Sequence, residues 1–347
     1  MTLKAPFPYF GGKRRAAPLI WEALGDPGGY IEPFAGSAAA LLARPAVSGR
    51  RVETLNDADG WLVNTWRAIR WAPDEVAHHA AWPISEIDYH ARLAWLQERR
   101  DDRLVSWLEG DPEVFDAKAA GWWLYVSACS IGDPWSKGPW RVVDGHLVKG
   151  DAGRGVRRIL PHLNAGRGVH RELPNLGNAG QGVHRKRPNL GDAGRGVHRG
   201  HDTTGTHEEQ VRAYMRTLAA RLERVRITCG SWERVLTPTP LRTRSGGDPV
   251  TGVLLDPPYS TSHDVYAETE AGISCRVREW CHTAPNDLRI VLCGYDNEHD
   301  DLLDAGWRVI QGKSGSGSGY SKNRANGRRE RLWLSPACHH AGEEGLW

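Results

Sequence analysis

At residues 253–259 the chain reads Val253-Leu254-Leu255-Asp256-Pro257-Pro258-Tyr259. The apolar run predicts a buried strand, and the two prolines predict a rigid turn at its end. The Asp256 carboxylate and the Pro257 carbonyl are hydrogen-bond acceptors, and Tyr259 offers a flat ring for stacking. This combination suits chemistry on the exocyclic amino group of a nucleobase. An isolated Asp-Pro-Pro-Tyr is equally compatible with an ordinary strand-to-loop turn, so the rest of the chain must decide.

Short segments rich in apolar and β-branched residues predict seven strands, at 30–32, 52–55, 226–229, 252–255, 289–293, 307–310 and 331–334. Helical patterns lie between many of them. Thr206 and Glu209 predict a capping box ahead of apolar residues at helical spacing, and another predicted helix follows Asp59. Alternating strands and helices predict an α/β fold in which helices cover both faces of a mostly parallel sheet.

About 170 residues separate the second predicted strand from the third, far more than a crossover needs, so we expect a large insertion. Residues 86–125 have helical periodicity. Residues 151–205 repeat, with units that begin at Asp151, Asn164, Asn178 and Asp192 and periods of 13, 14 and 14 residues. The glycines of each unit predict tight turns. A flexible glycine-rich insert, a short stacked array that contacts DNA, and a surface for a protein partner all fit this pattern.

The composition excludes several classes of protein. Hydrophobic residues make up 40% of the chain and charged residues 25%, as in globular proteins. No run approaches the roughly 18 apolar residues of a membrane helix, and the first ten residues lack the apolar core of a signal peptide, so we expect a cytoplasmic protein without membrane contact. The six cysteines form no C-x-x-C pair, which predicts reduced structural thiols and no metal site. None follows a proline, which disfavours covalent attack on cytosine C5.

Three segments predict a site for a small molecule. The predicted strand at 30–32 ends at Glu32 and leads into a turn of small residues around Gly36, where a ligand can approach the backbone. The next strand runs into Asn56 and Asp57, which places the Asp57 carboxylate where it can bind ribose hydroxyls; a helix cap is the alternative. Phe10-Gly11-Gly12-Lys13 is not a Walker A loop, but its ring and cation can form one wall of a cofactor site.

In this order, these segments resemble the Dam-like family of S-adenosylmethionine-dependent DNA adenine-N6 methyltransferases. The motifs are residues 10–13, 32–36 and 56–57, then an inserted target-recognition region, then Asp256-Pro257-Pro258-Tyr259. The resemblance covers residues 4–71 and 206–335. It implies a mostly parallel, seven-stranded, Rossmann-like methyltransferase sheet whose last two strands form an antiparallel edge hairpin.

The resemblance also implies roles for individual residues. The cofactor would be S-adenosylmethionine, and no metal would be needed. The residues that bind the cofactor would be Phe10, Gly11, Gly12, Lys13, Glu32, Pro33, Phe34, Ala35, Gly36 and Asp57. The flipped target adenine would lie at Asp256, Pro257, Pro258 and Tyr259. One departure concerns the turn after the third strand, where the family often carries an acidic residue and this chain has Ser231 and Trp232.

The expected partner is double-stranded DNA. The net charge is only +3, but residues 151–205 hold ten Arg and Lys against four Asp and Glu, as in a surface that contacts phosphates or in a solvated loop. The candidate DNA contacts are Trp135, Lys137, Trp140, Arg154, Arg167, Arg195, Lys322, Arg324 and Arg328. A cognate restriction endonuclease is a candidate second partner, and a monomer or weak dimer is expected.

The expected organisation is a discontinuous catalytic core at 1–71 and 206–335. A mostly helical target-recognition region at 72–150 and the repeat insert at 151–205 interrupt it, and a C-terminal tail follows at 336–347. Two other functions stay open. One is methylation of cytosine at N4, and the other is nucleic-acid binding by a chain whose methyltransferase core has decayed.

Overall fold

The computed structural model describes residues 3–7, 9, 11–46, 49–99, 102–130, 140–143, 146–149, 206–258, 272–311 and 329–340. At 102–103, 140–143 and 146–149 it describes only the backbone. The chain divides into two compact units. The first is Met1–Thr2, Gly11–Ala58 and Arg224–Trp347, and the second is Leu3–Phe10 and Asp59–Glu223. This division places the helix after Asp59 and the helix after Thr206 in the second unit, while the functional boundaries at 71 and 206 stay predictions.

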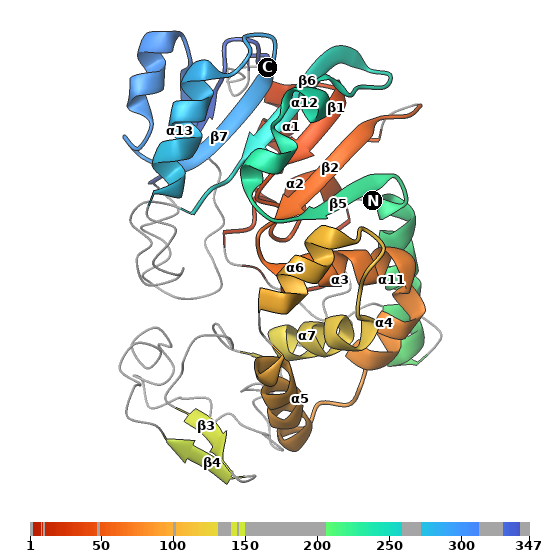
Figure 1. Ribbon diagram of the computed structural model, residues 1–347. Coiled ribbons are helices and arrows are strands. Elements are labelled where there is room, and N and C mark those ends of the chain that lie inside the picture. Colours follow the sequence, from red (N-terminus) through yellow and green to blue (C-terminus); the bar gives the residue numbers. More distant parts are fainter. Residues whose placement is uncertain are drawn as a thin grey trace, which may run out of the picture. The chain divides into compact units, whose positions relative to one another are not determined.

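The first unit is built on a seven-stranded sheet, and all seven predicted strands are confirmed (Figure 1). They are β1 Pro27–Glu32, β2 Val52–Asp57, β5 Val225–Cys229, β6 Asp248–Leu255, β7 Arg289–Tyr295, β8 Arg308–Gln311 and β9 Glu330–Leu334. Their order is β5-β2-β1-β6-β7-β9-β8. The first five strands are parallel, and β9 runs antiparallel to both β7 and β8. The insertion of β9 between β7 and β8 departs from the Rossmann order, in which the sixth strand follows the fifth.

Helices and 3-10 turns cover both faces of this sheet, because alternate residues of each strand point to opposite sides. On one face Ile31, Val253, Ile290 and Trp333 belong to an apolar cluster. The covering elements that contribute to it are η3 Trp232–Val235, α12 Pro238–Arg242, α13 Ile273–Thr283 and η5 Asp300–Ala305. On the other face the Tyr30 ring packs against Trp21 of α1 Ala17–Leu24, with ring centroids 4.8 Å apart. The Trp21 indole N–H also donates a hydrogen bond to the Ala40 carbonyl of helix α2, Ala39–Leu42.

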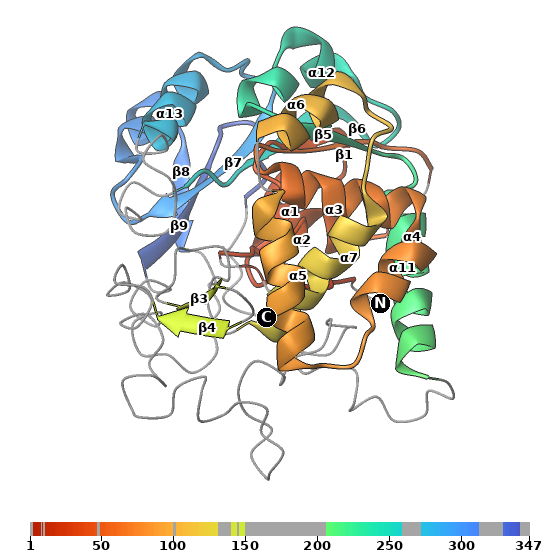
Figure 2. The same cartoon turned by 60° about the horizontal axis from the view of Figure 1, so that its bottom comes forward.

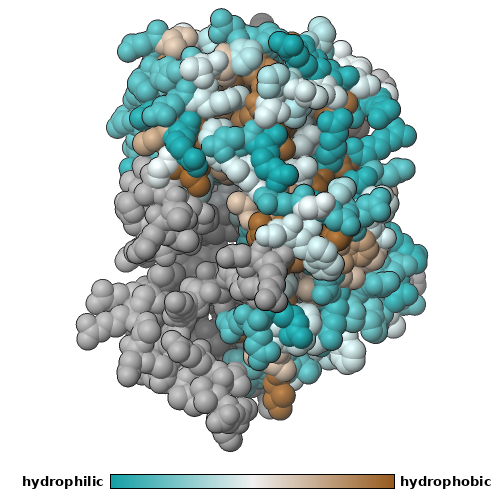
Figure 3. Space-filling model, viewed as in Figure 1, coloured by the Kyte–Doolittle hydropathy of each residue, from teal (hydrophilic) through white to brown (hydrophobic). Residues whose placement is uncertain are grey.

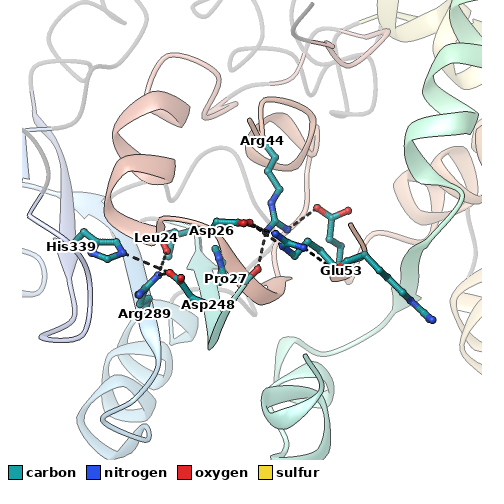
Figure 4. Close-up of polar contacts among 10 residues, drawn as sticks. Leu24, Asp26, Pro27, Arg44, Glu53, Asp248, Arg289 and His339 are labelled. Carbon is teal, nitrogen blue, oxygen red and sulfur yellow. Dashed lines mark hydrogen bonds and ion pairs between the residues drawn. The ribbon is translucent and has the colours of Figure 1, made fainter. Parts of the chain in front are cut away.

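Ion pairs hold the amino ends of the central strands together (Figure 4). Asp26 pairs with Arg44 at 3.1 Å and with Arg51 at 2.5 Å, and Arg44 also reaches Glu53 at 3.0 Å. The hydrogen bond from Arg51 lowers the pKa of Asp26. Arg289, at the start of β7, pairs with Asp248, at the start of β6, at 2.5 Å and also donates to the carbonyl of Leu24. This edge is therefore occupied by structural contacts.

The second unit is mainly helical (Figure 2). Its helices are α3 Gly60–Trp71, α4 Pro73–Ala80, α5 Glu86–Glu98, α6 Asp102–Gly110, α7 Ala117–Cys129 and α11 His207–Leu222. The capping box of Thr206 and Glu209 is confirmed, and the Asp59 side chain caps α3. The region 72–150 is not helical throughout, because β3 Trp140–Val143 and β4 His146–Lys149 pair as an antiparallel hairpin. The predicted repeats at 151–205 lie outside the described residues.

The N-terminal segment is part of this helical unit. Phe7 is buried, and its ring lies 5.5 Å from that of Trp66 on α3 and 4.8 Å from that of Trp123 on α7. The Lys4 backbone N–H donates to the Tyr214 hydroxyl at 2.9 Å, and that hydroxyl donates to the Lys4 carbonyl at 2.7 Å. Residues more than 200 positions apart thus share one core.

In the view of Figure 3, hydrophilic side chains cover most of the visible described surface, and hydrophobic ones occur as separate spots. Within the part of the chain that the structure describes, no helix has the length and apolar character needed to cross a membrane.

Gly121 tests the packing of α4 against α7. A Cβ atom there would collide with the Cβ of His79 and lie 2.9 Å from the Val76 carbonyl oxygen, whereas a Cβ at Gly110 would meet nothing within 4 Å. We expect Gly121→Ala to lower the free energy of unfolding by about 1–3 kcal/mol despite the better helix propensity of alanine. Gly110→Ala should be neutral or stabilising. Urea denaturation of both variants checks this, and equal stability would contradict the packing described.

Candidate active site

The candidate site lies where the carboxyl ends of five parallel strands meet. Glu32 ends β1, Asp57 ends β2, and Asp256 follows β6 directly. Because β1 has β2 on one side and β6 on the other, the chain reverses its direction of travel across the sheet here. Such a switch point is where open α/β sheets bind their ligands.

Asn56, near the end of β2, joins the turns that follow β1 and β5. Its side-chain N–H groups donate to the Pro33 carbonyl at 3.1 Å and to the Gly230 carbonyl at 2.9 Å. Its Oδ1 accepts from the Thr228 hydroxyl at 3.0 Å. Asn56 is only 1% exposed, so these bonds satisfy an amide that would be costly to bury alone.

The turn after β1 is held close to Asp57. The Gly36 N–H donates to Asp57 Oδ2 at 2.9 Å, and the Ala35 N–H donates to the Asn56 carbonyl at 2.8 Å. Gly36 and Ala38 both have a φ of 48°, in the left-handed region. A non-glycine residue there costs roughly 1–2 kcal/mol, and such strain is concentrated at functional sites. The structure therefore brings Gly36 and Asp57 together, and their binding of a cofactor stays a prediction.

Lys13 and Asp256 form a largely buried ion pair. Lys13 Nζ lies 2.8 Å from Asp256 Oδ1, the side chains are 6% and 21% exposed, and Nζ also donates to the Gly11 carbonyl at 2.9 Å. Burial alone would lower the pKa of Lys13, but the facing Asp256, with smaller contributions from Cys293 and Glu330, raises it above its ordinary value. Lys13 is therefore a fixed positive charge against the Asp256 carboxylate.

Glu32 is a second buried carboxyl group at this edge. It is 3% exposed, and the Tyr30 hydroxyl donates to its Oε2 at 3.0 Å. Burial raises the pKa of Glu32 to about 8. The hydrogen bond from Tyr30 opposes the rise, and the nearby Asp256 and Asp57 add smaller increases. A carboxyl group perturbed in this way is typical of a functional site, because stability alone would favour an apolar side chain.

Sequence reasoning missed some residues of the site. The Trp232 ring stacks on Phe34, with centroids 6.1 Å apart and an interplanar angle of 27°, and meets Trp280 edge-on. Its position directly after the Gly230-Ser231 turn was the signal available. Glu330 begins β9. Burial raises the pKa of Glu330, the charge of Lys13 opposes the rise, and Asp256 adds to it. Its place at this edge follows only from the antiparallel direction of β9.

The predicted site residues fall into two groups. Lys13, Glu32, Pro33, Phe34, Ala35, Gly36, Asp57, Asp256, Pro257 and Pro258 are described, and Gly11 and Gly12 are exposed just before Lys13. Phe10, Tyr259 and the candidate DNA contacts Trp135, Lys137, Arg154, Arg167, Arg195, Lys322, Arg324 and Arg328 lie outside the described residues, and Trp140 is described only as backbone in β3. Their roles stay predictions.

Neither a scan against models of known protein families nor a search of curated proteins found a match for this chain.

The pKa of Glu32 predicts a specific pH dependence of stability. The folded chain holds this proton up to about pH 8 and the unfolded chain releases it near 4.5, so the unfolded state binds fewer protons in this window. Stability should therefore fall as pH rises, by about 1.4 kcal/mol per pH unit relative to Glu32→Gln. Denaturant unfolding of both proteins between pH 5 and 8 checks this. Parallel stability curves would show that Glu32 has an ordinary pKa.

Proposed function

We propose that this protein is an S-adenosylmethionine-dependent DNA methyltransferase that acts on the N6 amino group of adenine. The observation that carries the proposal is the ion pair between Lys13 and Asp256 at the carboxyl end of β6, beside the turn that follows β1. This ion pair joins the motif at residues 10–13 to the motif at residues 256–259, two of the segments on which the resemblance to the Dam-like family rests. The antiparallel hairpin of β8 and β9, which the same resemblance predicts, is also present.

The chemistry requires help at the amino group. The lone pair of N6 is delocalised into the adenine ring, so the nitrogen is a poor nucleophile until its hydrogens are held by acceptors. The Asp256 carboxylate and the Pro257 carbonyl supply two acceptors at one place, and Lys13 fixes the carboxylate through its 2.8 Å contact. A preorganised pair of acceptors favours the pyramidal nitrogen that attacks.

The residues on the β1 and β2 side fit the cofactor. Bound S-adenosylmethionine would supply a methyl group on a positively charged sulfur, which N6 takes while the carbon–sulfur bonding pair stays on sulfur. Asp57 provides a carboxyl group for ribose hydroxyls, and Glu32 provides a second one that keeps its proton up to about pH 8 and therefore offers hydrogen bonds and no negative charge. Gly36 allows close approach to the backbone, and the partly buried Phe34 offers an aromatic ring that the buried Trp232 supports from behind. The proton that N6 loses leaves through an acceptor, for which Asp256 is placed.

Asp256→Ala should abolish methyl transfer, because it removes one acceptor and releases Lys13. We expect a loss of at least about 100-fold in rate, with binding of S-adenosylmethionine changed only a few-fold. The measurement is transfer of isotopically labelled methyl groups to mixed-sequence duplex DNA, with the modified nucleoside identified by mass spectrometry.

Asp287→Ala is the matched control, since Asp287 is 60% exposed in the same unit and pairs only loosely with Arg244 at 3.5 Å. It should transfer methyl groups at the wild-type rate. Substantial activity in a folded Asp256→Ala protein would contradict the assignment. Labelled N4-methylcytosine in the wild-type reaction would move the function to cytosine, and binding of cofactor and DNA without transfer would favour a binding role.

A further inference from the structure

Two arginines follow Lys13 directly and remain unused in the site described above. The Ala17 N–H donates to the Lys13 carbonyl at 2.8 Å and the Ile20 N–H donates to the Ala16 carbonyl at 3.0 Å, so residues 13–16 already run in helical turns into α1. This winding buries Lys13 and Ala16 and exposes Arg14 and Arg15. The ion pair of Lys13 with Asp256 therefore fixes the backbone from which both guanidinium groups project.

These two arginines differ from several other arginines of the unit. Arg44, Arg51, Arg276, Arg278, Arg289 and Arg329 each pair with a carboxylate within 4.0 Å. Among the described residues, neither Arg14 nor Arg15 has an ion pair or a hydrogen-bonded acceptor for its side chain, and the first turn of α1 holds no acidic residue. Two uncompensated charges thus lie within two residues of the proposed catalytic ion pair.

We propose that Arg14 and Arg15 each bind a backbone phosphate of the DNA strand that carries the target adenine, an inference that rests on the proposed function. Arg14 and Arg15 follow Lys13 directly, and consecutive Cα atoms are about 3.8 Å apart. Both side chains therefore begin close to the ion pair. Extrusion of a base distorts the strand beside it, and cationic contacts to the flanking phosphates hold that strand in register. Guanidinium groups suit phosphate because they offer paired donors.

The cofactor carboxylate is the competing anion. It is disfavoured because Lys13 and Ala16 point into the protein, while Arg14 and Arg15 are exposed to solvent. The two ligands predict different results, since a phosphate contact alters DNA binding and a carboxylate contact alters binding of the cofactor alone.

The test compares Arg14→Gln, Arg15→Gln and the double variant with Arg50→Gln. Arg50 is an exposed arginine just before β2, at the opposite edge of the sheet. Affinity for mixed-sequence duplex DNA is measured as a function of salt concentration. Each arginine that contacts phosphate should reduce the slope of log K against log salt by about 0.9, so the double variant should lose about 1.8. Arg50→Gln should keep the wild-type slope.

Two further measurements separate a phosphate contact from a contact to the cofactor and from damage to the fold. Calorimetric binding of S-adenosylhomocysteine should be unchanged in all variants, and Arg14→Lys with Arg15→Lys should restore the slope because the charges remain. An unchanged slope in the double glutamine variant would overturn the inference, as would weaker S-adenosylhomocysteine binding with normal DNA binding. Wild-type protein that binds no DNA would overturn the proposed function together with this inference, which distinguishes the two failures.

Discussion

The hydrogen bonds of Asn56 are the constraint on which the site depends. Asn56 lies near the end of β2. Its buried side-chain amide ties the backbone after β1, at Pro33, to the backbone after β5, at Gly230. The Gly230 N–H returns a bond to the Asp57 carbonyl at 2.9 Å. Because each turn is fixed to the next, the positions of Gly36, Asp57 and Trp232 are set together. An unsatisfied amide at 1% exposure would be costly, so this arrangement is maintained as a unit.

The β1 and β6 side of the same edge concentrates charge where apolar packing would be more stable. Lys13 and Asp256 are paired, and Glu32 is held by Tyr30 with a pKa near 8. Burying such groups is unfavourable unless they are paired or neutral, and here one pair is matched and the third group keeps its proton. The left-handed Ala38 adds strain to the adjoining turn.

The two compact units are interleaved in sequence. Residues 59–223 lie between β2 and β5, yet these strands pair in parallel from Glu53 with Val225 to Asp57 with Cys229. The entropy of closing a loop grows only slowly with its length, so a long insertion weakens this pairing little. The second unit has a core of its own, in which Phe7, Trp66 and Trp123 meet and Tyr214 binds Lys4.

The sequence by itself determined the seven strands, the capped helices after Asp59 and Thr206, and the placement of Glu32, Asp57 and Asp256 at strand ends. These are local properties, because periodicity, caps and prolines act within a few residues, and parallel strands share one carboxyl edge. Only the tertiary structure decided that β9 lies between β7 and β8, that Lys13 pairs with Asp256, and that Trp232 stacks on Phe34. It also decided the pKa of Glu32 and the hairpin of β3 and β4. Partner choice and burial depend on residues far apart in the chain, and no local pattern encodes which of several compatible side chains will meet.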